Sequence, residues 1–132
     1  MTKGYKVVTT LLDPEALSDL VGQYPTTCLV VKLDVTQHAE ISAAFIKAQE
    51  AFGRIDVVFN NAGKMINGEL ESVNDEDARG MFEVNFWGAA QVTREAMRFF
   101  RDVNRPQGGR LLQMSSGLGI LSCPCFGHYS AS

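Results

Sequence analysis

Two hydroxyl side chains that could take part in catalysis lie near the C-terminal end. They are Ser116 and Tyr129, which stand thirteen residues apart. A tyrosine can transfer a proton, but its ordinary pKa of about 10 is too high for an efficient base at neutral pH. Such a tyrosine needs a nearby cation that stabilises its phenolate. The chain ends Tyr129-Ser-Ala-Ser132, so no lysine stands one helical turn after the tyrosine within this sequence.

Amide and carboxylate side chains follow or interrupt apolar segments further upstream. Asn60-Asn61-Ala62-Gly63 follows the apolar run Ile55–Phe59, and Asp34-Val35 follows another run. Asn85 interrupts the apolar face of a long helical pattern. Because a buried amide is costly unless its hydrogen bonds are met, we expect Asn85 to have a partner.

Four short apolar runs predict the strands that would position these residues. The strands are expected at Tyr5–Thr10, Cys28–Leu33, Ile55–Asn60 and Arg110–Ser115, and each is apolar as a strand buried on both faces should be. Longer amphipathic segments lie between them. This alternation predicts an α/β fold in which βα units surround a parallel sheet.

Three helices are expected between these strands. Proline at the first turn favours a helix over Pro14–Val21. The second helix has Thr36 as a plausible N-cap and Gly53 as a stop signal. The third begins at Asn74, supported by Asp77, and ends in a segment rich in proline and glycine at residues 104–109. Its apolar stripe comprises Phe82, Phe86, Ala89, Val92, Ala96, Phe99 and Val103.

Composition limits the classes of function. The 132 residues, 45% of them hydrophobic, fit one domain, and 12 basic against 15 acidic residues give a net charge of −3 without a basic cluster, which disfavours nucleic-acid binding. No run approaches the roughly 18 apolar residues of a membrane span. The start of the sequence lacks the apolar core of a signal peptide, so we expect a cytoplasmic protein.

The cysteines and histidines do not predict a metal site. Cys28, Cys123 and Cys125 are an odd count without the paired spacing of a zinc site, and His38 and His128 are isolated. Cys123-Pro-Cys125 lacks both the further thiols of a metal site and the two-residue spacer of a redox motif. Incidental, reduced loop cysteines and ordinary surface histidines are the simpler interpretation.

Five segments occur in one order at consistent intervals. They are Leu33-Asp-Val-Thr36, Asn60-Asn-Ala-Gly63, Asn85 within Val84-Asn-Phe-Trp-Gly88, Ser115-Ser116, and Tyr129 with the three residues after it. Together they resemble the short-chain dehydrogenase/reductase family, from its second strand to its catalytic tyrosine. The resemblance implies a partial Rossmann-like, doubly wound parallel sheet and one incomplete domain over residues 1–132, truncated at both ends.

The resemblance implies hydride transfer between a nicotinamide cofactor and a small carbonyl or alcohol substrate. Tyr129 would be the acid/base, Ser116 would hydrogen-bond the substrate oxygen, and Asn85 would carry a water in a proton relay to the lysine that this sequence lacks. Simpler interpretations stay open. Ser116 would cap local backbone at a strand end, Tyr129 would border the core, and Asn85 would point to solvent.

The resemblance also implies cofactor-binding residues. Asp34 and Val35 would flank the adenine, while Asn61, Ala62 and Gly63 would let backbone approach a ribose. An aspartate that simply precedes a helix and a generic turn after a strand are the alternatives. Either NAD or NADP remains open, because the residues after the first predicted strand select neither.

Departures from the family's pattern affect both the expected binding of the cofactor and the expected pairing of the strands. No Thr-Gly-x-x-x-Gly-x-Gly occurs in residues 1–132, although that turn places the pyrophosphate on a helix N-terminus in the family. In the family's strand order, the strand before this turn lies between the strands expected at Tyr5–Thr10 and Ile55–Asn60. Those two strands would therefore either expose unpaired edges or pair with each other in a rearranged sheet.

Two hypotheses for function follow. In the first, the chain is part of an NAD(P)-dependent oxidoreductase, inactive as it stands because the phosphate-binding turn and the lysine are missing. In the second, it is a non-catalytic remnant that binds a partner, with copies pairing through the helix over residues 82–103. Titration with NADH and NADPH, combined with a thermal melt, would separate the two.

Overall fold

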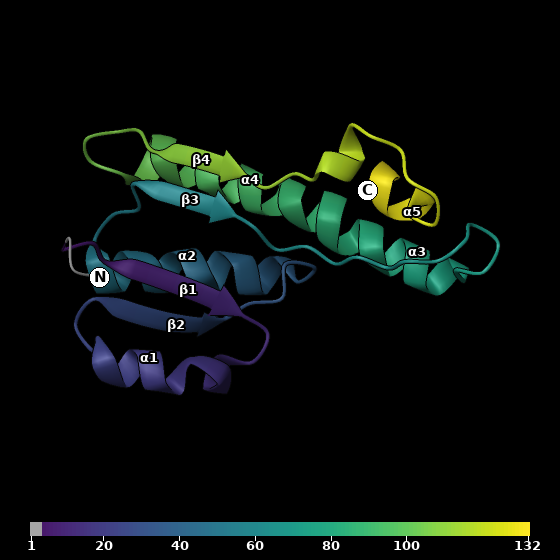
Figure 1. Ribbon diagram of the computed structural model, residues 1–132. Coiled ribbons are helices and arrows are strands. Elements are labelled where there is room, and N and C mark those ends of the chain that lie inside the picture. The colour runs from purple at the N-terminus through teal and green to yellow at the C-terminus, as the bar shows by residue number, and fades with distance from the viewer. Residues whose placement is uncertain (1–3) are drawn as a thin grey trace.

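The computed structural model describes residues 4–132 and shows an α/β arrangement with parallel strand pairs (Figure 1). Strand β1 (Val7–Leu11) pairs in parallel with β2 (Cys28–Lys32). Strand β3 (Val57–Asn60) pairs in parallel with β4 (Arg110–Gln113). The expected partial parallel α/β sheet is confirmed, and each strand is shorter than the apolar run that predicted it.

The two strand pairs form separate sheets. No ladder joins β1 to β3 among the described residues, although these strands are neighbours and point the same way (Figure 1). Of the two expected arrangements, the structure therefore shows unpaired edges and not a rearranged sheet.

The first two helical segments lie close to their expected positions. Pro14–Leu17 forms the 3₁₀ helix η1, and α1 follows over Ser18–Gln23. Helix α2 spans His38–Phe52 and ends at Gly53, whose φ of 82° is the left-handed conformation of a helix stop. The expected N-cap at Thr36 is wrong, because Gln37 takes that position. Thr36 instead donates its backbone N–H and its hydroxyl to Asp34 Oδ1, at 2.9 and 2.8 Å.

The third helix is continuous and contains two π segments. It comprises α3 (Asp75–Phe82), the π segment η2 (Glu83–Gly88), α4 (Ala89–Arg98) and the π segment η3 (Phe99–Val103). The expected cap is confirmed, since Asn74 Oδ1 accepts from the Asp77 N–H at 2.9 Å. Phe86 was expected on the apolar face but is 50% exposed. A π turn adds a residue and so rotates the face that the preceding helix presents.

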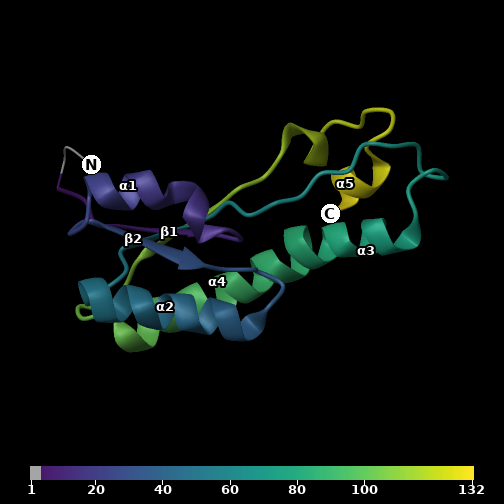
Figure 2. The ribbon, with the colours of Figure 1, turned by 90° about the horizontal axis from the view of Figure 1, so that it is seen from below.

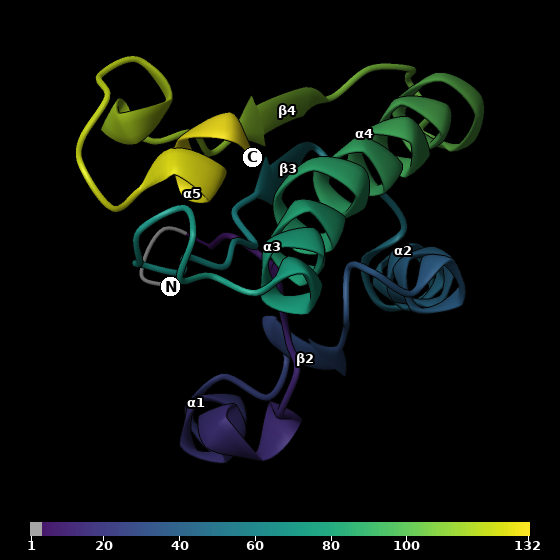
Figure 3. The same ribbon diagram turned by 90° about the vertical axis from the view of Figure 1, so that its right-hand side faces the viewer.

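Helices α2 and α4 lie together on one side of the strands, and α1 lies on the other (Figures 2 and 3). The core between α2, α4 and the strands includes Val35, Ile41, Phe45, Val92, Ala96, Phe99 and Phe100. Partly buried Val58 of β3 and Leu111 of β4 pack against the same cluster. A single core therefore supports both sheets from the helix side.

The C-terminal segment carries two short helices, η4 (Gly117–Gly119) and α5 (Gly127–Ala131), beside α3 (Figure 1). These two helices contact each other. Over the described range, residues 4–132, none of the helices combines the length and the apolar character needed to cross a bilayer.

Candidate functional site

Asn85 joins three of the segments that the sequence singles out. Its Oδ1 accepts from the Lys64 N–H at 2.8 Å, and its Nδ2 donates to the Lys64 carbonyl at 2.8 Å. The same Nδ2 donates to Ser132 Oγ at 2.8 Å. The Asn85 amide therefore holds together the Lys64 backbone, directly after Gly63, and Ser132, three residues after Tyr129. The expected partner of Asn85 is found, and the alternative in which its amide points freely to solvent is wrong.

The π segment that carries Asn85 packs closely against the end of the first sheet. A Cβ atom at Gly88 would stand 2.7 Å from Val35 Cγ2, so only glycine allows the helix to approach this closely. Asn85 lies within the same π segment, whose wider turn departs from the regular helical spacing. The close approach at Gly88 and the π turn together set where the Asn85 amide stands.

The segment after β3 is exposed to solvent. Asn61, Ala62 and Gly63 are all exposed. Asn60, just before them, is buried, and its Nδ2 donates to the Ala89 carbonyl and to Gln113 Oε1, both at 2.9 Å. The amide of Asn60 thus bonds both helix α4 and the neighbouring strand β4, and the next three residues stay exposed.

Ser116 is the N-cap of η4 and Tyr129 lies in α5, the two C-terminal helices that contact each other. Ser116 Oγ accepts from the Leu118 N–H at 3.2 Å, so the serine caps local backbone while its O–H remains a donor. Tyr129 is partly buried in α5, and its ring lies 6.4 Å from that of Phe126. Within residues 4–132 the hydroxyls of Ser116 and Tyr129 are not hydrogen-bonded to each other. The structure brings their helices together without closing a direct contact.

Asp34 and Val35 occupy the turn after β2. One carboxylate oxygen of Asp34 accepts two hydrogen bonds from Thr36, which leaves its second oxygen for another donor. Val35 is only 8% exposed, and its side chain lies in the hydrophobic core. A ligand at this turn would therefore meet the Asp34 carboxylate and the backbone of Val35.

These positions fit only part of a dinucleotide. The second oxygen of Asp34 and the exposed backbone of Asn61–Gly63 suit the adenosine and ribose groups. The pyrophosphate needs backbone N–H groups converging at a helix N-terminus, and no glycine-rich turn of that kind occurs in the sequence. Residues 1–132 thus lack the strongest anchor for a nicotinamide cofactor.

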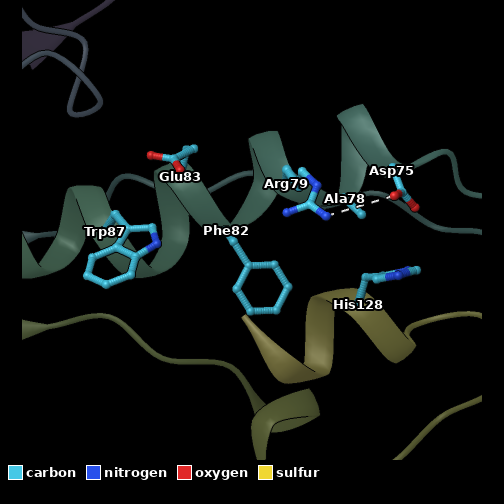
Figure 4. A pocket seen from close by; sticks show the side chains of 7 residues that line it. All are labelled: Asp75, Ala78, Arg79, Phe82, Glu83, Trp87 and His128. Atoms are coloured by element: carbon cyan, nitrogen blue, oxygen red, sulfur yellow. Dashed lines mark ion pairs between the residues drawn. The ribbon is translucent and has the colours of Figure 1, made fainter.

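A shallow pocket of about 380 Å³ lies between α3 and α5. Figure 4 shows Phe82 and His128 facing it from the two helices, and the ion pair between Asp75 and Arg79 at its edge. That ion pair is 3.9 Å long and largely exposed to water, so it contributes little to stability. None of the expected catalytic residues lines this pocket, so it is not the candidate site.

Sequence reasoning missed Lys64 and Ser132 as members of the site. Lys64 takes part through its backbone, which any residue type offers, so its side chain gave no signal. Ser132 stands three residues after Tyr129, and its hydroxyl also donates to the Tyr129 carbonyl at 2.9 Å. Residues three apart on a helix are neighbours, and this spacing was the one indication in the sequence that Ser132 lies close to Tyr129.

The cysteines and acidic groups form no metal centre in the part of the chain that the structure describes. Cys28 is buried, whereas Cys123 and Cys125 are exposed, and all three are free thiols. The site therefore consists of hydroxyl, amide, carboxylate and backbone groups.

Comparisons with known proteins find relatives over the whole length of the chain. The family described as short chain dehydrogenase matches residues 1–132. An uncharacterized oxidoreductase of Schizosaccharomyces pombe is 39% identical over 132 residues, which are 100% of this chain and 43% of that protein. Oxidoreductase calM of Penicillium decumbens is 37% identical over 98% of this chain and 43% of its own length.

Solved structures share the fold. A short-chain dehydrogenase from Streptomyces avermitilis superposes with a TM-score of 0.88 at 34% identity, over 98% of this chain and 47% of that one. A short chain dehydrogenase/reductase from Burkholderia phymatum, solved in complex with NAD, gives a TM-score of 0.89 at 29% identity, over 98% and 47%. The chain spans less than half the length of these relatives.

Proposed function

The chain belongs to the short-chain dehydrogenase/reductase family, and on that premise we propose that it is part of an NAD(P)-dependent oxidoreductase acting on a small carbonyl or alcohol substrate. The Asn85 amide is the observation that carries this proposal. It ties the backbone after Asn61-Ala62-Gly63 to the residue that ends the helix of Tyr129. The segment proposed to meet the cofactor and the helix that carries the proposed acid/base are thereby joined through one side chain.

The roles of the residues follow from their chemistry. Tyr129 exchanges a proton with the substrate oxygen, and the Ser116 O–H donates a hydrogen bond that holds this oxygen beside it. Asn85 is a positioning residue, because all of its amide hydrogen bonds go to Lys64 and Ser132. Asp34 and the Asn61–Gly63 backbone contact the adenosine side of the cofactor, which supplies the hydride when bound.

We further propose that residues 1–132 do not catalyse this reaction by themselves. A tyrosine at neutral pH needs a cation to stabilise its phenolate, and a dinucleotide needs an anchor for its phosphates. Residues 1–132 contain neither a lysine one turn after Tyr129 nor a glycine-rich turn of this kind. The NAD complex of the Burkholderia phymatum protein supports nicotinamide use in the family, not binding by this chain.

A direct test is fluorescence titration of the 132-residue chain with NADH and NADPH, followed by a thermal melt. We expect a cooperative melt and no saturation at micromolar cofactor. Saturable micromolar binding would show that the chain binds the cofactor without this turn, and cofactor oxidation with a carbonyl substrate would overturn the inactivity proposal.

The residue roles are tested in a chimera that places residues 1–132 between the flanking segments of the 39% identical Schizosaccharomyces pombe relative. We expect the chimera to bind NADH or NADPH and to oxidise it with members of a panel of aldehydes and ketones. Tyr129→Phe should then lower kcat by about 10²–10⁴-fold while leaving cofactor affinity unchanged. Phe126→Leu, which alters the neighbouring ring, is the matched control. A Tyr129→Phe chimera with an undiminished rate would exclude the acid/base role.

A second candidate function rests on exposed aromatic side chains of the long helix. Phe86 and Trp87 are 50% and 48% exposed, and their rings meet edge to face with centroids 4.8 Å apart. Copies of the chain pairing through residues 82–103 would cover these rings. Light scattering should then show a dimer that Trp87→Ser dissociates, whereas Arg94→Ser, an exposed change on the same helix, leaves it intact. A monomer at all concentrations excludes this candidate.

A further inference from the structure

Cys123 and Cys125 form a pair of surface thiols in the loop between η4 and α5. Both thiols are exposed and free, whereas Cys28, the third cysteine of the sequence, is buried in β2. Figures 1 and 2 show β2 far from α5, so Cys28 is not within reach of this loop. Each exposed cysteine therefore has only the other as a possible disulfide partner within residues 1–132.

The backbone turns at these two cysteines. The Phe126 N–H donates to the Cys123 carbonyl at 3.4 Å, and Cys125 has a φ of 67°. A proline at the second position and a positive φ at the third are the pattern of a type II turn. Such a turn holds the Cα atoms of its first and third residues about 6 Å apart, against about 7 Å in an extended segment. Disulfides usually join Cα atoms about 4.4–6.8 Å apart. The turn therefore brings a pair with a one-residue spacer into bonding range.

Cys125 stands at a position where glycine is the usual residue. A side chain at a positive φ costs free energy, and residues held in this conformation cluster at functional sites. The Cys125 side chain is exposed, so it gains little from burial that would offset this cost. The thiol is the property that distinguishes this residue from the less strained glycine.

The turn is held against the segment that follows β3. The Gly68 N–H donates to the Cys125 carbonyl at 2.9 Å. Leu70 packs beside Gly127, where an added Cβ atom would stand 3.4 Å from Leu70 Cδ1. These contacts join residues distant in the sequence, so they exist only in the folded chain. Folding therefore fixes the turn that holds the two thiols near each other.

We propose that Cys123 and Cys125 are a modification site that reacts with low-molecular-weight disulfides of the glutathione type and closes to a reversible disulfide. The thiolate of one cysteine attacks a sulfur of the small disulfide, forms a mixed disulfide and releases one small thiolate. The thiolate of the other cysteine then attacks the protein sulfur of this mixed disulfide and releases the second small thiolate. Two protein thiols are oxidised, one small disulfide is reduced to two thiols, and the two cysteine protons pass to the released thiolates.

The site is tested by equilibrating the 132-residue chain with oxidised and reduced glutathione. The reaction is stopped with acid, and peptide mass spectrometry locates each disulfide. We expect a chain that has lost two hydrogen atoms, with the bond between Cys123 and Cys125. The same equilibration in urea is the control for the folded turn. Unfolding should lower the ratio of internal to mixed disulfide at least about fivefold, because the thiols are no longer held together.

Three variants separate the pair from its surroundings. Cys125→Gly keeps the turn, since glycine adopts a positive φ freely, and should leave glutathione on Cys123 as a mixed disulfide. Cys123→Ser should leave it on Cys125 in the same way. Cys28→Ala, the matched control at the buried cysteine, should form the internal disulfide as readily as the original chain.

The remaining outcomes overturn the proposal. Mixed disulfides that predominate on the folded chain would show that the second thiol does not reach the first. Equal ratios with and without urea would show that the folded turn does not bring the thiols together. If the 132-residue chain does not melt cooperatively, the measurement is made in the chimera with the Schizosaccharomyces pombe flanking segments, and a chimera without the internal disulfide excludes the site. None of these readouts uses a nicotinamide cofactor, so they are independent of the proposed catalytic function.

Discussion

The two faces of the β3–β4 sheet differ in how completely they are covered. On one face, Val58 and Leu111 pack against the core that α2 and α4 share. On the other face, Val57, Phe59 and Leu112 are 51%, 57% and 53% exposed. Parallel sheets are normally buried on both faces, so the open face marks where covering layers are absent from residues 4–132. The helix side therefore carries a packed core, whereas the opposite side leaves apolar strand residues exposed.

The largest effect is expected inside the packed core. Phe99 is 1% exposed, and its ring lies 5.7 Å from that of Phe45. Phe99→Ala should lower the free energy of unfolding by about 3–5 kcal/mol, because it removes buried surface and leaves a cavity. Urea denaturation measures this loss. Met97→Ala, at a 52% exposed position of the same helix, should stay within about 0.5 kcal/mol. Equal losses for the two variants would show that the helix does not present this face to the core.

The next largest effect is expected at Asn104, whose buried side-chain amide hydrogen-bonds backbone groups on the helix-covered side of the β3–β4 sheet. Asn104 is 0% exposed, and its Oδ1 accepts from the Ile55 N–H at 3.2 Å. Its Nδ2 donates to the carbonyls of Ile55 and Gly108, both at 2.6 Å. Asn104→Ala should cost about 2–3 kcal/mol, because it leaves buried backbone groups without partners. Thermal melting measures this loss of stability, with the exposed Gln107→Ala as control. An Asn104→Ala variant as stable as the original chain would contradict this role.

A smaller, pH-dependent effect is expected at the outer border of the core. Arg98 donates to both carboxylate oxygens of Glu95, at 3.0 and 2.6 Å, and this hydrogen bonding lowers the pKa of Glu95 despite the opposing effect of burial. A carboxylate with a lowered pKa contributes stability above its unfolded pKa, here 4.5, and loses it as the pH falls further. Because Arg98 is half exposed, the contribution is about 0.5–1 kcal/mol.

Glu95→Gln measures this contribution. At pH 7 the variant should be less stable than the original chain by that amount, and the difference should vanish as the pH falls below 4.5. Asp75→Asn, which removes an exposed ion pair, is the control and should show little change. A difference that grows on acidification would have the wrong sign for this account.

The smallest effect is expected on the open face. Phe59→Thr replaces a 57% exposed side chain and keeps a residue that favours strands. Its cost should stay within about 0.5 kcal/mol, whereas Val58→Ala on the covered face should cost about 1 kcal/mol or more. Paired urea titrations compare them. If Phe59→Thr costs more than Val58→Ala, the two faces have been assigned the wrong way round.

The positions of the strands and of several helix ends could be predicted from the sequence. Apolar runs located all four strands, and Asn74 and Gly53 marked helix ends through side-chain capping and a left-handed φ. Local chemistry of this kind does not depend on distant contacts. The expected cap at Thr36 failed because Asp34 competes for the same residue with two hydrogen bonds.

The remaining features depend on contacts between distant segments. The π segment Glu83–Gly88 has no periodic signal in the sequence, and it includes Gly88, which packs against the distant Val35. It exposes Phe86, which regular helical spacing placed in the core. The need of Asn85 for a partner was predictable, but Lys64 backbone as that partner was not, because a backbone group looks alike at every position.

Hydrogen exchange of the free chain tests the central claim most directly, namely that β1 and β3 are each paired on one edge only. Val58 and Asn60 N–H groups face β4 and should exchange slowly, whereas those of Val57 and Phe59 should exchange at least about tenfold faster. The same alternation should distinguish Val7 from Val8 in β1. Equally slow exchange at Val57 and Phe59 in the dilute chain would contradict the account, because it would mean that the two sheets pair with each other.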